Sequence, residues 1–265
     1  MSGGEDALGW LRDLCGRYEH EPVAVYRRRG SHAWPIEAAD ADDLERQLRE
    51  GGHFLPLPKE SASLANVIEV SLVDFLLRQV EGRDDIRLVR GTERGYPDLE
   101  LTGSAFGDEH HAIDVKTARR AVTKAGRLNP KRTQSRITLY TGNTYFRHPE
   151  LRWPGTFRPF QDYASHIDIL AIYTLDEASD ARVRDLELIV QEAWRIGSRQ
   201  RSSTTREYIG AVDDIELLRE GRGEFETAND FYRYWRRFHF KIGRTVEEQL
   251  KKLLKEQGGG SDRGT

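Results

Sequence analysis

Two short segments with alternating apolar and charged residues constrain the fold of this chain more than any other feature. They cover residues 99–101 and 112–116, and a turn-rich stretch at 103–109 lies between them. Because successive side chains of a strand point to opposite faces, this pattern predicts two strands joined as a β-hairpin. If their apolar faces pack in the core, the polar side chains that converge on one patch are Asp98, Asp114 and Lys116.

This patch would have the chemistry of a magnesium site beside a cation. Carboxylate oxygens on a rigid sheet are hard ligands that suit Mg²⁺, and a lysine two residues beyond the second carboxylate can hold a water or a phosphate oxygen. A metal and an ammonium group together fit phosphodiester hydrolysis, because both stabilise negative charge on phosphorus. Alternating charges are also typical of the solvated face of a strand, so the spacing alone leaves both interpretations open.

Length and composition place the chain among large, highly charged globular domains. It has 265 residues, of which 37% are hydrophobic and 32% charged, enough for a sizeable core. No apolar run reaches the roughly 18 residues that span a membrane, and the start of the chain lacks the order of a signal peptide. Cys15 is the only cysteine, which excludes an intramolecular disulfide and a cysteine zinc site. We expect a cytoplasmic protein.

The charges are unevenly distributed along the chain. The net charge is only −3, but residues 116–136 contain eight Lys or Arg residues and no Asp or Glu. Local charge matters more than the sum for a polyanionic partner. An isolated basic cluster is often a solvated loop, but this one begins at the predicted metal site, which favours DNA as the partner.

Apolar periodicity predicts the other elements. A helix over 6–18 carries Cys15 on its apolar side, and a second over 63–80 begins at Ser63 as N-cap. Its apolar stripe is Leu64, Ile68, Leu72 and Phe75. Further strands are expected at 23–26, 86–90, 167–173 and 186–190, and further helices at 38–50, 159–165, 225–238 and 246–255.

Several segments resemble, in the same order, the EcoRV restriction endonuclease family of the PD-(D/E)xK nuclease superfamily. That superfamily is named for a Pro-Asp pair followed by Asp or Glu, any residue and Lys. The segments that carry the resemblance are 52–69, 96–98, 112–117, 142–146, 159–163 with His166, 194–196, 209–210 and 231–235. The resemblance covers about residues 50–240, with 37–50 as extra material.

The resemblance implies an α/β restriction-endonuclease-like fold, with a central mixed β-sheet flanked by helices and the active site on a β-hairpin. It assigns Asp98 and Asp114 to metal binding and Lys116 to catalysis. It also assigns Glu69, otherwise an ordinary solvated position off the apolar stripe, to a second metal position. We expect a single domain at 1–257: residues 1–60 help to form a dimer, 61–257 carry catalysis and DNA recognition, and 258–265 are disordered.

The resemblance further implies a type II enzyme that acts as a homodimer on double-stranded DNA. It would need Mg²⁺ and cut a short palindrome to blunt ends, and a cognate DNA methyltransferase would act on the same site. Two symmetry-related active sites can cut both strands of a palindrome, which makes the dimer physically reasonable.

DNA reading falls, by resemblance, to a loop after Trp194. Here the sequence departs from the family, because a gapless match puts Ser202 and Thr204 where the family has glycines. Arginine reads guanine in the major groove but also binds phosphate, so the recognition sequence stays open. The residues expected to contact DNA are Arg94, Arg119, Arg199, Arg201, Ser202, Ser203, Thr204, Thr205 and Arg206.

Two other functions remain open at this point. A structure- or mismatch-directed repair nuclease would use the same active site without a fixed palindrome. A catalytically silent DNA-binding protein would keep only the fold, although the intact set of Asp98, Asp114 and Lys116 argues against it. His110 and His111 lack further ligands at metal-site spacing, so we expect no metal there.

Overall fold

The computed structural model describes residues 6–20, 38–44, 46, 61–92, 95–176 and 183–258. Several expectations lie outside this part of the chain: the strand at 23–26, residues 45 and 47–50 of the helix at 38–50, Arg94, and the tail after residue 258. Residues 41–44 of that expected helix are helical. The greater part of the expected N-terminal dimerisation part, 1–60, lies outside the described residues too.

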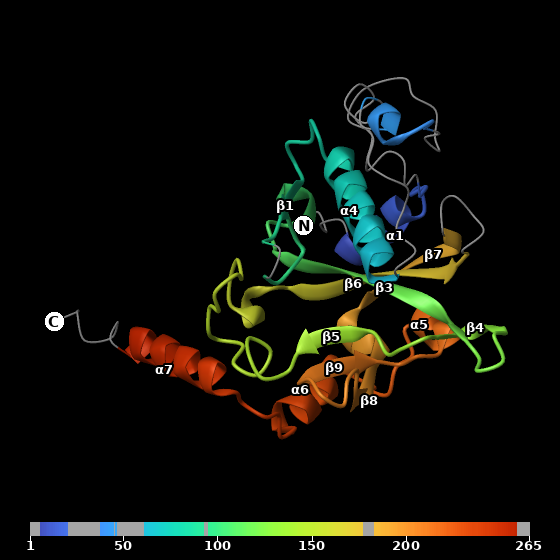
Figure 1. Ribbon diagram of the computed structural model, residues 1–265. Coiled ribbons are helices and arrows are strands. Elements are labelled where there is room, and N and C mark those ends of the chain that lie inside the picture. Colours follow the sequence, from blue (N-terminus) through green and yellow to red (C-terminus); the bar gives the residue numbers. More distant parts are fainter. Residues whose placement is uncertain are drawn as a thin grey trace.

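A mixed sheet forms the centre of the molecule (Figure 1). Five strands follow one another across it: β1 (Arg87–Arg90), β2 (Leu99–Thr102), β3 (His111–Val122), β6 (Ser165–Leu175) and β7 (Val183–Glu192). β3 and β6 are parallel, whereas the other neighbours along this path are antiparallel. β4 (Leu128–Thr133) pairs with the far end of β3. The predicted central mixed sheet is therefore confirmed.

Two helices, α1 (Ala7–Cys15) and α4 (Ser61–Gln79), cover one face of this sheet (Figure 1). The carboxylate of Asp6 caps α1 by accepting hydrogen bonds from the first backbone N–H groups of the helix. The predicted cap of α4 is wrong, because α4 already includes Ser61 and places Ser63 inside its first turn. The core on this face includes Leu11, Leu14, Leu72, Leu76, Ile113, Val115, Ile167 and Ile169.

A second, three-stranded sheet packs on the other face. It consists of β5 (Thr138–Thr141), β9 (Tyr208–Ala211) and β8 (Gly197–Arg201), and α6 (Ala228–Arg237) lies beside it. The core here is rich in aromatic residues and includes Tyr140, Phe146, Leu170, Ile172, Phe231 and Trp235. This second sheet was not predicted from the sequence. In place of the helix expected at 159–165 the chain forms one 3₁₀ turn, η2 (Phe160–Asp162).

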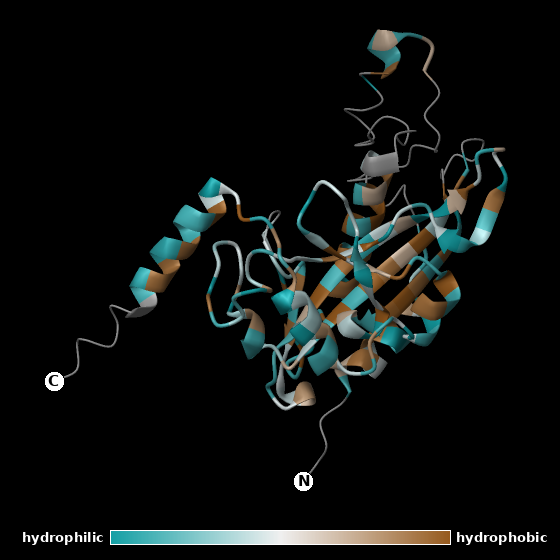
Figure 2. Cartoon of the chain, turned by 90° about the horizontal axis from the view of Figure 1, so that it is seen from below, coloured by the Kyte–Doolittle hydropathy of each residue, from teal (hydrophilic) through white to brown (hydrophobic). Residues whose placement is uncertain are grey.

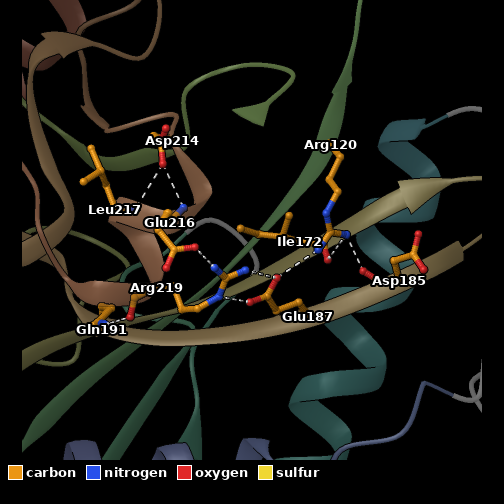
Figure 3. A network of polar contacts seen from close by, with 9 residues as sticks. All are labelled: Arg120, Ile172, Asp185, Glu187, Gln191, Asp214, Glu216, Leu217 and Arg219. Atoms are coloured by element: carbon orange, nitrogen blue, oxygen red, sulfur yellow. Dashed lines mark hydrogen bonds and ion pairs between the residues drawn. The ribbon is translucent and has the colours of Figure 1, made fainter. Parts of the chain in front are cut away.

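Glu187 of β7 ties three elements together (Figure 3). Its carboxylate accepts hydrogen bonds from Arg120 of β3 at 3.0 Å and from Arg219 of α5 (Ile215–Glu220) at 2.8 Å. Arg120 also donates to the carbonyl oxygen of Ile172, at 3.3 Å. Arg120 is 8% exposed, so this member of the basic cluster forms interactions inside the protein and does not contribute to an exposed basic surface.

The last helix, α7 (Arg244–Gly258), extends away from the body of the molecule (Figure 1). Figure 2 shows hydrophobic and hydrophilic residues side by side along it. Within the described part of the chain, none of the helices combines the length and the apolar composition needed to cross a bilayer.

Replacing Ile113 with Ala should lower the free energy of unfolding by about 2–5 kcal/mol, because Ile113 is fully buried between β3 and the covering helices. Urea denaturation followed by circular dichroism measures this loss. Leu128, which is 40% exposed, is the matched control, and its replacement by Ala should cost no more than about 0.5 kcal/mol. Equal losses in the two variants would contradict the assigned core.

Candidate active site

The β2–β3 hairpin brings the three predicted polar side chains together. Asp98 directly precedes β2, and its Oδ2 accepts a hydrogen bond of 2.7 Å from the backbone N–H of Val115 on β3. Leu99 pairs with Ile113, so both apolar side chains enter the core under the helices. Because the strand alternates, Asp114 and Lys116 lie on the opposite face. The predicted hairpin is thus present.

Lys116 and Asp114 form a close ion pair, with Nζ and Oδ2 2.5 Å apart. Burial raises the pKa of Asp114 well above its usual range; Lys116 opposes this rise, and Asp98 and Asp168 add to it. Burial by itself would lower the pKa of Lys116. The negative charges of Asp114, Asp98 and Asp168 have a larger, opposite effect, and they raise the pKa of Lys116 above its ordinary value. Lys116 is therefore charged at neutral pH.

A cavity of about 310 Å³ opens beside this pair. Glu69 of α4, Asp98 and Lys116 line it, together with Arg136 and Thr138 from the start of the second sheet. Burial raises the pKa of Glu69, and the Asp98 charge adds to this rise while Lys116 and Arg90 oppose it. The structure therefore brings Glu69 to the same site. Sequence analysis included Arg136 only as a member of the basic cluster.

Asp168 is a site residue that sequence analysis missed. It lies on β6 and pairs in register with Asp114 on the parallel strand β3. Burial raises the pKa of Asp168 to about 7, with Lys116 opposing and Asp98 reinforcing the rise. The residue stands in a nearly continuous apolar run, 167–173, where a single aspartate was the one available signal.

The donors at this site fit a magnesium ion. Within the described residues, no group of three His, Cys, Asp or Glu side chains forms a ready set of metal ligands. Mg²⁺, however, usually keeps several waters and is bound through one or two carboxylates. Asp98 and Asp114 supply such a pair, close enough that Asp98 adds to the rise in the pKa of Asp114, and the buried Oδ2 of Asp168 lacks a hydrogen-bond partner in this part of the chain.

A buried aromatic cluster lies below the site. The Tyr96 hydroxyl donates to Nδ1 of His166 at 2.6 Å, and Nε2 of His166 donates to the Phe160 carbonyl oxygen at 3.1 Å. His166 also stacks on the Phe160 ring, with centroids 3.7 Å apart. Both ring nitrogens are thereby used by a neutral imidazole. Burial lowers the pKa of His166 to about 3.

The β8–β9 hairpin, which carries most of the predicted DNA-reading residues, is joined to the wall of the cavity. The hydroxyls of Ser202 and Thr138 are 2.7 Å apart, and Arg136 donates to the side chain of Gln200 at 2.8 Å. Thr138 and Arg136 also line the cavity. A shift of this hairpin would therefore act on the residues that line the cavity beside Lys116.

The arginines of this hairpin have different surroundings. Arg199 points toward α6, with its guanidinium over Phe225 and its backbone N–H donating to Glu224. Arg201 bonds Glu207 and the Thr204 carbonyl oxygen. The tip is a tight turn in which the Ser203 hydroxyl accepts from two backbone N–H groups, and its exposed residues are Thr204, Thr205 and Arg206.

The other two predicted DNA contacts, Arg119 and Arg94, lie away from the β8–β9 hairpin in the sequence. Arg119 is half-buried on β3, near the junction with β4. Arg94 lies in the two-residue gap at 93–94 that the structure does not describe.

The two adjacent histidines, for which no metal was expected, have other partners. His111 contacts the Ser165 hydroxyl at 2.8 Å, and His110 lies 3.4 Å from Glu100.

The mixed sheet with helices on one face, and a hairpin that carries two carboxylates and a lysine, define a restriction-endonuclease-like fold. The family model of the restriction endonuclease EcoRV matches residues 31–256, a wider span than the segments noted in the sequence. The chain therefore belongs to the EcoRV restriction endonuclease family.

Among solved structures, the crystal structure of the restriction endonuclease BglI bound to its DNA recognition sequence is similar to this chain. The two share 14% sequence identity, with a TM-score of 0.35 over 80% of this chain and 84% of that chain. No curated protein sequence matches the chain.

The contribution of His166 to folding stability should fall as the pH drops below about 6.5 toward 3, because unfolded His166 binds a proton that the folded protein excludes. At this position the unfolded state binds one proton more than the folded state, so the His166 contribution rises with pH across this window. The raised pKa values of Asp114 and Asp168 act in the opposite sense, so only a comparison of variants isolates His166. His166 contributes up to about 4–5 kcal/mol. The difference in the free energy of unfolding between the wild type and His166→Gln should shift against the wild type as the pH falls through this window, as measured by urea denaturation. The exposed His239, changed to Gln, is the control, and an unchanged slope in His166→Gln would contradict the buried neutral state.

Proposed function

We propose that this protein is a type II site-specific deoxyribonuclease that hydrolyses phosphodiester bonds of double-stranded DNA with Mg²⁺. Membership of a restriction endonuclease family supports a nuclease. The observation that carries the proposal is the assembly of Asp98, Asp114 and Lys116 on one hairpin, beside a cavity lined by Arg136.

In this proposal Asp98 and Asp114 hold the magnesium ion, and Glu69 serves a second metal position from α4. The bound ion would supply a Lewis acid that lowers the pKa of water and offsets charge on phosphorus. Lys116 keeps its positive charge because of the surrounding carboxylates, and it positions the nucleophile and stabilises the charged transition state. Arg136 reaches the same cavity and suits a phosphate oxygen.

Two copies of the chain would act on one palindrome. A two-fold dimer presents two equivalent sites to the two strands, so that both can be cut within a symmetric sequence. The resemblance of the chain to its family supports blunt ends and a cognate DNA methyltransferase that protects the same site. The β8–β9 hairpin, connected to the cavity through Ser202 and Arg136, is the proposed base-reading element.

Replacing Lys116 with Ala should lower the cleavage rate by about 10²–10³-fold and leave DNA affinity within a few fold, because one electrostatic stabiliser of the transition state is lost. The measurement is digestion of a sequenced plasmid with and without Mg²⁺, beside DNA binding by fluorescence anisotropy. Lys255→Ala, an exposed change on α7, is the control.

The same digest separates the proposed function from the alternatives. Discrete bands that require both Mg²⁺ and Lys116 support the site-specific enzyme, and sequencing of the ends gives the site and the overhang. A smear, or nicking at mismatches only, would favour a repair nuclease. Tight binding without cleavage by the wild type would favour a silent DNA-binding protein.

Replacing Arg206 with Ala should weaken DNA binding, because Arg206 is exposed at the tip of the β8–β9 hairpin. If Arg206 binds phosphate, the loss is similar for all sequences and the slope of log affinity against log salt falls by about 1. If it reads a base, cognate DNA loses about 1–3 kcal/mol and specificity relaxes at one position. Arg222→Ala on an exposed turn is the control, and unchanged DNA binding by Arg206→Ala would remove the tip from the interface.

A further inference from the structure

Asp168 stands one strand away from the proposed metal ligands, on the same face of the sheet. It is the direct register partner of Asp114 across the parallel β3–β6 pair. Paired residues of neighbouring strands point to the same face, and the strands are about 4.8 Å apart. Its chain neighbours Ile167 and Ile169 enter the opposite core, under α1 and α4. The Asp168 carboxylate therefore faces the site that holds Asp114 and Lys116.

The carboxylate of Asp168 is buried and incompletely satisfied. Asp168 is 1% exposed, and its Oδ2 has no hydrogen-bond partner among the described residues. A buried polar atom without a partner is costly, and a buried carboxylate is normally paired or held near a metal. The nearby cation Lys116 is already held by Asp114, at 2.5 Å. Protonation of Asp168 would remove the charge but would still leave Oδ2 without a partner.

The fully ionised site around Lys116 carries an excess of negative charge. Asp98, Asp114 and Asp168 carry three negative charges when ionised, and Lys116 supplies one positive charge, which leaves two negative charges in a mostly buried site. One divalent cation balances this excess. Because Asp168 adds half of the excess charge, removal of its carboxylate should change how tightly the site holds such an ion.

We propose that Asp168 is a positioning residue of the metal site, which strengthens divalent-cation binding by Asp98 and Asp114 from the neighbouring strand. The inference rests on the proposed Mg²⁺-dependent function and deepens it. Asp168 does not complete a ready three-ligand group with the other carboxylates of the described chain, so it acts through its charge and as a hydrogen-bond acceptor. Outer-shell carboxylates of this kind typically change metal affinity by about 10–100-fold.

The test is Mn²⁺ binding to the full chain without DNA, measured by titration calorimetry and by electron paramagnetic resonance. Asp168→Asn keeps the shape of the side chain and removes its charge, and it should raise the dissociation constant for Mn²⁺ by about 10–100-fold. Thr174→Val is the matched control, since Thr174 lies on the same strand, is buried, and has a hydroxyl without a hydrogen-bond partner in the described part of the protein. The control should bind Mn²⁺ like the wild type.

A second readout separates positioning from a merely structural role. In cleavage assays, Asp168→Asn should need about 10–100-fold more Mg²⁺ for the half-maximal rate but approach the wild-type rate at saturation. If Asp168→Asn fails to fold, Asp168→Leu tests the same point, because it removes an uncompensated buried charge. Without divalent ions, Asp168→Leu should melt at a temperature no lower than that of the wild type. Added Mn²⁺ should raise the melting temperature of Asp168→Leu less than it raises that of the wild type.

The outcomes distinguish this inference from the proposed function. Equal Mn²⁺ affinity of Asp168→Asn and the wild type, with Mg²⁺-dependent cleavage intact, would overturn the role of Asp168 and leave the nuclease standing. If the wild type bound no Mn²⁺ and Asp114→Asn changed nothing, the magnesium site itself would be wrong, and the inference would fall with it.

Discussion

The parallel pairing of β3 with β6 is the contact on which the rest of the structure depends. Nine residues of each strand pair in register, from His111 with Ser165 to Arg119 with Tyr173. β6 is buried along almost its whole length, so this pairing is shielded from water on both faces. A shift of one residue would exchange the faces of every side chain and would move Asp114 and Lys116 into the apolar core under α4. The cost of that exchange fixes the geometry of the site.

The two faces of the central sheet differ in polarity. The face under α1 and α4 is uniformly apolar, and it holds Ile113 and Val115 between the strands and the helices. The opposite face is apolar only beyond the site, where Leu170 and Ile172 meet the aromatic residues of the second sheet. Between these apolar regions the chain buries acidic groups beside one lysine, an arrangement that lowers stability and is typical of functional sites.

Local signals in the sequence sufficed for the hairpin, because its two strands are close in sequence and each alternates with period two. Asp98, Asp114 and Lys116 could therefore be grouped from the sequence alone. Glu69 could not be assigned by periodicity, since it lies off the apolar stripe of α4, and only the family resemblance selected it. Asp168 and Arg136 depend on contacts between distant segments, which periodicity does not reveal. The second sheet was missed because its strands are short and polar at their ends, for example Thr138 and Thr141 in β5.

The environment of each arginine adds information that the sequence did not contain. A count of basic residues treats Arg120, Arg199 and Arg206 alike. Arg120 is held by Glu187 in the interior, and Arg199 is occupied by the aromatic rings and Glu224 beside α6. Arg206 is exposed at the hairpin tip, beside Tyr208. A positive charge is available to a polyanion only where the protein has not already paired it, so the surface proposed to bind DNA is narrower than the basic cluster suggests and includes the hairpin tip.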